Sequence, residues 1–246
     1  MIRNFRKVVL IIMAIVSSVS FTSCMRDLNL ANAKEVADLL QAKYGIEFVV
    51  DSIGNRLASD RADTLTAYCH PKENEKVVFE AVMSVSRELI SDNYPKRLLE
   101  IEAKDRIETE FSRYGINANV SVSLSKLTVQ IDPETASLDQ IIKDNPALSL
   151  TFSTVVCNYY DASKLYDVVV SILEGLYSED PEMQLGTMVW NLSESAYQNC
   201  ADEMNKRHSV DKTFFESFDP LGCATLAINN GLINVSKEEF YEAFGR

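Results

Sequence analysis

Hydrophobic side chains near the start of the folded chain change from a helical to an alternating spacing. Over residues 32–45 they recur every three or four positions, with Asn32 and Glu35 as the expected capping pair and Gly45 as the helix stop. Three strand-like runs follow, at residues 46–52, 63–69 and 77–85. Residues 70–74 favour the turn of an antiparallel hairpin. The pattern therefore predicts a helix followed by three strands.

The spacing becomes helical again over residues 95–114, and residues 119–131 then alternate, with a break near the middle of that run. These segments predict an α-β-β-β-α-β unit over residues 32–132 that closes a core of its own. The pair Asp132 and Pro133 marks the expected boundary with the rest of the chain.

The second half, residues 133–246, is richer in helical patterns. Helices are expected to begin at Ser137 and at Asp161, and to occupy residues 193–206, 221–229 and 236–244. Strands are expected at residues 148–157 and 183–192, with a polar connection over 207–220. The predicted fold is α+β: a mostly antiparallel sheet with packed helices, followed by a helix-rich α/β second half.

Composition agrees with a globular fold. Of 246 residues, 46% are hydrophobic and 24% charged, while only 8 are Gly and 6 are Pro. So few Gly and Pro residues exclude collagen-like and low-complexity classes and disfavour a turn-rich all-β architecture. No repeat of fixed period occurs, which excludes solenoids and propellers.

Residues 1–23 have the pattern of a secretory signal peptide. Arg3, Arg6 and Lys7 precede nine consecutive apolar residues, 8–16. That run is well short of the roughly 20 residues that span a bilayer. We therefore expect a cleaved signal rather than a membrane-spanning helix.

The segment that follows, Phe21-Thr22-Ser23-Cys24, resembles the lipobox of bacterial lipoproteins. Phe21 departs from the aliphatic residue preferred at its position. The resemblance implies cleavage before Cys24, a diacylglycerol on its sulfur, and an anchor with more than one acyl chain, followed by a short tether over residues 24–31. It implies a cell-envelope location, expected to be the outer membrane, and the lack of an acidic run after the cysteine favours its periplasmic side.

The charge balance is acidic and changes the set of expected partners. Net charge is −12 for the whole chain, and the signal carries three basic residues and no acidic one, so the mature chain has −15. Such a surface repels nucleic acid, which is therefore not an expected partner, and is compatible with a cationic protein partner. An acidic balance that serves only solubility is the alternative.

Four cysteines remain after lipidation of Cys24: Cys69, Cys157, Cys200 and Cys223. An even number in an exported chain permits two disulfides, with connectivity that the sequence does not settle. Free buried thiols are the alternative, since cysteine often acts as a small core hydrophobe. No Cys-x-x-Cys pair is present, which disfavours a zinc ribbon or a thioredoxin-type site.

The sequence contains no set of residues that identifies a reaction, so we expect no catalytic residue, metal or cofactor. It has only two histidines, His70 and His208, and lacks hydrolase, Walker A and dinucleotide-binding signatures. The carboxylates at 100, 102, 108 and 110 alternate with basic residues, as on a solvated helix face. Trp190 is expected in the core, and Tyr159-Tyr160 is a weak hint of a binding surface.

Two tripeptides, beginning at Asp51 and Asp63, are similar to the acceptor sequence of a bacterial O-glycosylation system, which makes Ser52 and Thr64 candidate modification sites. Beyond the lipobox, the body resembles uncharacterised bacterial lipoproteins over about residues 33–125. The resemblance rests on the segments Lys43 to Phe48, the Pro71 hairpin, Phe79-Glu80 and Asp92 to Tyr94. This resemblance implies no activity for the chain.

Function is therefore expected to be non-enzymatic binding by a membrane-anchored envelope lipoprotein. A solute- or glycan-binding lipoprotein and a periplasmic immunity protein against a basic toxin are the alternatives. An enzyme would need buried acids with shifted pKa values in a pocket.

Overall fold

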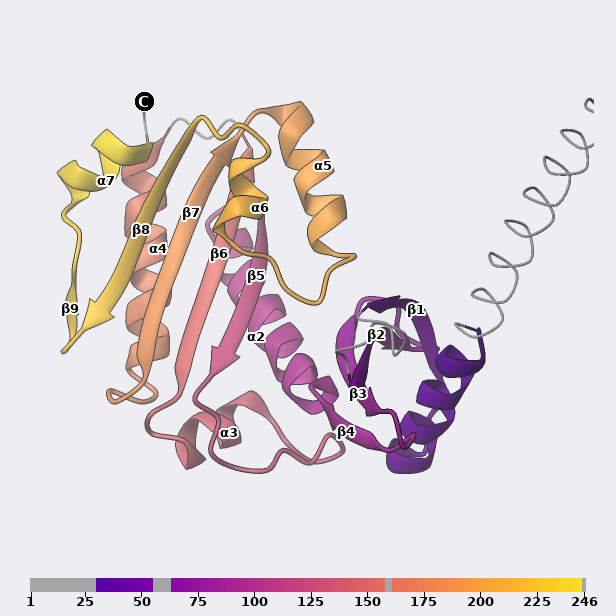
Figure 1. The fold of residues 1–246 in the computed structure, drawn as a ribbon. Coiled ribbons are helices and arrows are strands. Elements are labelled where there is room, and N and C mark those ends of the chain that lie inside the picture. The colour runs from indigo at the N-terminus through magenta and orange to yellow at the C-terminus, as the bar shows by residue number, and fades with distance from the viewer. Residues whose placement is uncertain (1–29, 55–62, 158–160, 245–246) are drawn as a thin grey trace, which may run out of the picture. The chain divides into compact units, whose positions relative to one another are not determined.

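The computed structural model describes residues 30–54, 63–157 and 161–244 (Figure 1). The chain divides into two compact units, Met1–Glu75 with Phe79–Asp92 and Lys76–Val78 with Asn93–Arg246. The expected boundary after residue 132 is wrong, because the strand over 118–125 pairs with a strand of the second unit rather than with the first sheet.

The first unit is a helix over residues 30–44 and a four-stranded antiparallel sheet. The strands lie in chain order: β1 (Phe48–Gly54), β2 (Thr64–Pro71), β3 (Phe79–Ser84) and β4 (Leu89–Asp92). Alternate side chains of β2 and β3 are buried, and the Phe48 and Phe79 rings meet edge to face at 5.5 Å. The helix, the three expected strands and the hairpin turn are confirmed.

Two details of this unit differ from the expectation. The helix already includes Asn32, whose side chain is buried, so Asn32 is not its cap. Strand β4 was not predicted because it has only four residues and one irregularity in its pairing with β3. Gly45 ends the helix as expected, with a positive φ of 74° that glycine adopts without strain.

The second unit is built on a five-stranded sheet with the order β5-β6-β7-β8-β9. Its strands are β5 (Ala118–Ser125), β6 (Ser149–Cys157), β7 (Gln184–Leu192), β8 (Gly222–Asn229) and β9 (Leu232–Ile233). Its helices are α2 (Tyr94–Arg113), α3 (Leu138–Asp144), α4 (Ala162–Tyr177), α5 (Glu194–Met204), α6 (Lys212–Glu216) and α7 (Lys237–Phe244). Only β6 and β7 are parallel, and α4 forms the crossover between them.

The main core lies between one sheet face and the helices behind it in Figure 1, among them α2, α4 and α7. Helix α4 contributes six buried apolar side chains, and Asp161 caps it by accepting a hydrogen bond from the Lys164 amide at 3.0 Å. Ser137 and Ser193 cap α3 and α5 in the same way. The fold is α+β, as predicted.

Three expectations for this unit are corrected. The segment expected as a helix over 221–229 forms strand β8 (Gly222–Asn229) instead, because Ala224, Leu226 and Ile228 alternate into the core and pair with β7. The alternating run that begins at 119 ends as a strand at Ser125, followed by Lys126 with a φ of 60°. The polar connection over 207–220 contains the short helix α6.

Candidate functional site

The face of the five-stranded sheet opposite the main core is covered at one end only. There α5 and α6 lie across the strands (Figure 1) and cover a row formed by Asn119, Val155, Trp190 and Cys223 on neighbouring strands. Trp190 is 1% exposed and stacks on Phe215 of α6, with ring centroids 5.3 Å apart. This second small core holds both helices and confirms Trp190 as a core residue.

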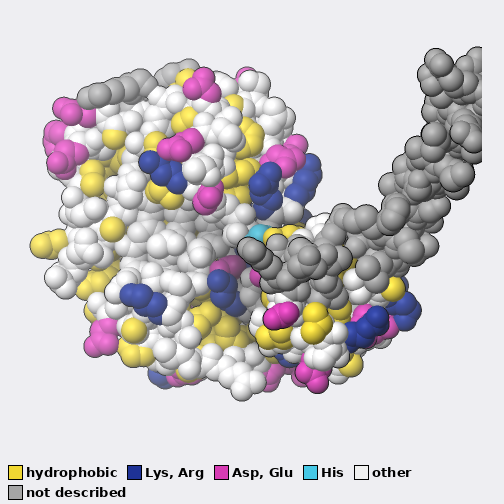
Figure 2. All heavy atoms as spheres, in the orientation of Figure 1, with side chains coloured by type: hydrophobic (Ala, Val, Ile, Leu, Met, Phe, Trp, Pro, Cys, Tyr) yellow, Lys and Arg dark blue, Asp and Glu magenta, His cyan; other side chains and the backbone are white. Residues whose placement is uncertain are grey.

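No helix among the described residues of the second unit covers the next rows of the same face. Strand register places Ser121, Ser153, Met188 and Thr225 side by side in one row. The following rows are Ser123, Thr151, Gly186 and Ala227, then Ser125, Ser149 and Gln184. We call these three rows the open face. None of their residues is charged, and Figure 2 shows the area mostly white, the colour of uncharged polar side chains and backbone.

A hollow with a volume of about 340 Å³ lies on the open face next to the α5–α6 segment. It is lined by Ser121, Val122, Ser123, Thr151, Phe152, Ser153, Gly186, Thr187, Met188, Val210, Thr225, Leu226 and Ala227. Val210 borders it from the connection between α5 and α6. None of these side chains is titratable.

Gly186 lies in the lining of this hollow. A Cβ added there would meet no atom closer than the Leu226 carbonyl oxygen at 3.6 Å, which is ordinary contact. Neither the space around the backbone nor a positive φ therefore requires glycine at this position. The missing side chain leaves room between Thr151 and Ala227, its two neighbours across the sheet.

Hydroxyl groups supply the polar atoms of the hollow. The side chains of Ser121, Ser123, Thr151, Ser153 and Thr225 make no hydrogen bond to any residue that the structure describes. Ser153 is 8% exposed as a residue, and its Oγ is not among the fully buried side-chain atoms without a partner, so the hydroxyl keeps contact with solvent in the hollow. An occupant of the hollow would remove that solvent contact, and a polar group shielded from water is ordinarily hydrogen-bonded.

A second hollow, of about 670 Å³, continues the surface toward the end of β8. It shares Thr151, Gly186 and Ala227 with the first and is bordered by Gln184, by Asn229 and by one carboxylate, that of Glu182. The open face therefore offers a continuous track longer than the first hollow alone.

The carboxylates of α2, expected on a solvated helix face, have structural partners. Glu100 is 4% exposed and accepts a hydrogen bond from the Leu124 amide at 3.0 Å. Glu108 accepts one from the Val120 amide at 2.9 Å, and burial raises its pKa although Lys104 opposes the shift. Both amides belong to β5, the edge strand, so these glutamates occupy donors that another strand would need.

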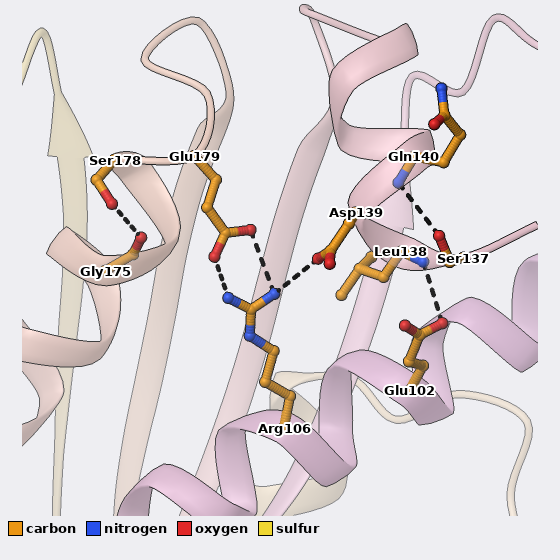
Figure 3. Close-up of polar contacts among 9 residues, drawn as sticks. All are labelled: Glu102, Arg106, Ser137, Leu138, Asp139, Gln140, Gly175, Ser178 and Glu179. Carbon is orange, nitrogen blue, oxygen red and sulfur yellow. Dashed lines mark hydrogen bonds and ion pairs between the residues drawn. The ribbon is translucent and has the colours of Figure 1, made fainter.

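Further along the same helix, polar contacts connect α2 with α3 and with the end of α4 (Figure 3). Arg106 lies between Asp139, at 3.1 Å, and Glu179, whose carboxylate it contacts with both terminal nitrogens. Glu102 accepts a hydrogen bond from the Leu138 amide at 3.0 Å. These groups position helices, and we assign them no catalytic role.

Replacing Glu100 with Ala is expected to lower the free energy of unfolding by about 2–3 kcal/mol, because it leaves the Leu124 amide and the nearby Arg97 guanidinium without their buried acceptor. Glu100→Gln keeps an acceptor oxygen and should cost less. Glu110→Ala, which removes only a surface pair with Arg113, is the control and should change stability by under about 0.5 kcal/mol. Urea unfolding of the three variants measures this, and equal losses for Ala at 100 and 110 would contradict the expectation.

The four cysteines in the described residues are free thiols, the second of the two alternatives left open by the sequence. Cys69 is fully buried in β2 of the first unit, whereas Cys157, Cys200 and Cys223 belong to the second unit. Burial raises the pKa of Cys69 and of Cys200 to about 12 and that of Cys223 to about 11. Thiols with such pKa values are almost fully protonated at pH 8 and react slowly.

Thiol titration of a Cys24→Ala variant therefore has a definite expected outcome. In guanidinium chloride without reductant, four thiols should react at once with a disulfide reagent. In native buffer at pH 8, Cys69 and Cys200 should lag by orders of magnitude, since both are 0% exposed and protonated. Recovery of two thiols or none in guanidinium would instead establish disulfides.

The remaining sequence-predicted residues are not brought together at one site. Ser52 lies exposed in β1 and Thr64 half-buried in β2. His70 faces away from Cys69 on β2, and its Nε2 lies 3.3 Å from an Asp51 carboxylate oxygen. Cys24 and Tyr159-Tyr160 lie outside the described residues.

Among residues 30–54, 63–157 and 161–244, no three His, Cys, Asp or Glu side chains are arranged to hold a metal ion. No helix in this described part has the length and apolar character needed to cross a membrane.

No protein-family model and no curated protein matches the chain. Among solved structures, it is similar to the crystal structure of a DUF5037 family protein from Ruminococcus gnavus ATCC 29149, with a TM-score of 0.62 and 17% sequence identity. The alignment covers 87% of this chain and 98% of that one. At this level of identity the similarity establishes a shared fold and nothing about function.

Proposed function

We propose that this chain is a cell-envelope lipoprotein, anchored at Cys24, whose folded part binds another envelope component without catalysing a reaction. The lipobox-like segment supports the anchor, and the outer membrane facing the periplasm is the proposed location. The single observation that favours binding is the hollow on the open face, where hydroxyl groups without protein partners surround Gly186.

The composition of the hollow favours binding over catalysis. General acid–base chemistry needs a carboxylate, imidazole, amine or thiol within reach of the substrate, and none is among its lining residues. Three carboxylates of α2, those of Glu100, Glu102 and Glu108, are committed to backbone amides. The acidic charge balance further supports a cationic or neutral partner over nucleic acid.

Metabolic labelling with a tagged fatty acid tests the anchor. Wild-type protein should be labelled and Cys24→Ala should not, and equal labelling of both would overturn the anchor. Affinity capture from detergent-solubilised envelopes tests binding, with Gly186→Leu as the matched variant because a side chain at 186 fills the hollow. A component recovered at least tenfold more with wild type supports the proposal, and identical recovery, whether of protein or polysaccharide, contradicts it.

A further inference from the structure

We infer that the hollow on the open face binds a neutral carbohydrate, with the hydroxyl of Ser153 as a central contact. The inference rests on the proposed binding function and specifies the chemistry of the occupant. It depends on the charge, the unpaired polar atoms and the geometry of the hollow.

The lining excludes charged occupants. Moving a charged group from water into a site without an opposite charge costs several kcal/mol, and the hollow offers neither a cation nor an anion. A sulfate, a phosphate or an ammonium group would therefore be desolvated there without compensation. The occupant that fits is neutral.

The unpaired hydroxyls exclude a purely apolar occupant. Ser153 is 92% buried by the sheet and its neighbours, and an apolar ligand would shield its hydroxyl completely without pairing it. A buried polar group without a partner costs about 1–3 kcal/mol. The occupant must therefore present hydrogen-bonding groups of its own, and hydroxyls suit it because each can donate and accept.

The arrangement of the hydroxyls matches an extended polyhydroxylated molecule. Ser121 lies opposite Ser153, and Ser123 lies opposite Thr151, so four hydroxyls form a two-by-two array. Sheet geometry spaces such an array by about 4.8 Å across strands and about 6.8 Å along them. Met188 and Val210 add apolar surface beside it, which suits the C–H face of a sugar ring.

A peptide strand fits this surface less well. Peptides that extend a sheet pair with main-chain groups of an edge strand. Two edge amides of β5, those of Val120 and Leu124, already donate to Glu108 and Glu100. The main-chain groups beneath the open face are used between the strands themselves.

The size of the hollow agrees with a small ligand or with one part of a longer chain. A volume of about 340 Å³ is at the lower end of the range for small-molecule sites, roughly 300–1,000 Å³. The second hollow shares Thr151, Gly186 and Ala227 with it, so a longer oligosaccharide can continue along the face. Gly186, which has no side chain, lies where the two hollows meet.

The test uses the full-length, lipidated protein in detergent on an array of oligosaccharides. The neutral probes are linear glucans, xylans and mannans of six or seven units, and the charged probes are uronic-acid and sulfated oligosaccharides. We expect binding to at least one neutral probe, confirmed by isothermal titration, and none to charged probes. Ser153→Ala and Gly186→Leu should each weaken that binding at least tenfold.

Ser125→Ala is the matched control, because Ser125 lies on the same face but outside the lining of the hollow. It should bind as wild type does, and all variants should keep the wild-type circular dichroism spectrum and melting temperature within a few degrees. Absence of neutral binding, equal binding to charged probes, or insensitivity to both variants would overturn the inference.

The result also separates this inference from the proposed function. If wild type captures an envelope protein through a surface that Gly186→Leu blocks, and no oligosaccharide binds, the proposed function stands and the carbohydrate inference fails. A self-associated dimer in analytical ultracentrifugation that Gly186→Leu disrupts would likewise overturn the carbohydrate inference. If no envelope component and no carbohydrate is bound, both fail.

Discussion

Replacing Trp190 with Ala is expected to lower the free energy of unfolding by about 3–5 kcal/mol, the usual cost of truncating a fully buried aromatic residue. The side chain is 1% exposed and stacks on Phe215 with an angle of 17° between the rings. Both rings belong to the cluster through which α5 and α6 cover the end of the sheet. Their loss would loosen the two helices as well as leave a cavity.

Trp190→Phe is the matched variant and should cost much less. The indole Nε1 is buried without a hydrogen-bond partner in the described residues, so replacing the ring by Phe also removes an unsatisfied donor. Because Trp190 is the chain's one Trp, unfolding of both variants must be followed by far-ultraviolet circular dichroism in urea rather than by fluorescence. A loss for Ala that is no larger than the loss for Phe would contradict this expectation.

Local signals in the sequence predicted most helices and strands, for physical reasons that particular elements make clear. Helix α4 combines a strong apolar stripe with the Asp161 cap, and both signals lie within a few residues of one another. Helix α7 begins at the box in which the Ser236 amide donates to Glu239 and the Glu239 amide donates to Ser236. Such features need no knowledge of the rest of the chain.

The errors arose where long-range pairing decides the structure. Strand β8 alternates Ala224, Leu226 and Ile228, yet its short apolar run also fits a helix, and only pairing with β7 distinguishes them. Glu100 resembles any surface glutamate of a helix until β5 is known to be an edge strand whose amides need acceptors. The domain boundary was misplaced for the same reason, since β5 belongs to the second sheet.

The candidate site was missed although half of its signal is visible in the sequence. Serines at 121, 123 and 125 alternate with apolar residues, and Ser149, Thr151 and Ser153 do so on a second strand. This alternation shows that one face of each strand is polar and uncharged. It does not show that the two strands are neighbours, that Gly186 adjoins them, or that α5 and α6 stop short of these rows. Those facts depend on register and on packing between segments distant in sequence.

Gly222→Ala should destabilise the protein by about 1–3 kcal/mol, because the added methyl group collides with the C-terminal end of α7. Its Cβ would lie 2.7 Å from the carbonyl carbon and 3.0 Å from the Cα of Phe244, which are backbone atoms that no rotamer change can move. Relief requires α7 to shift away from β8. That shift would expose Phe240 and Phe244, which are 0% and 1% exposed and stack on each other at 5.2 Å.

Gly186→Ala is the control for this effect, since both positions are glycines in strands of the same sheet. At 186 the nearest atom to an added Cβ is 3.6 Å away, so the substitution should be neutral or stabilising by about 0.4–1 kcal/mol through the lower entropy of the unfolded chain. Urea unfolding gives the two free energies, and limited proteolysis should show faster cleavage near α7 in Gly222→Ala alone. Equal stability of the two variants would mean that α7 yields to the methyl group at little cost, and that its packing on β8 is looser than these distances indicate.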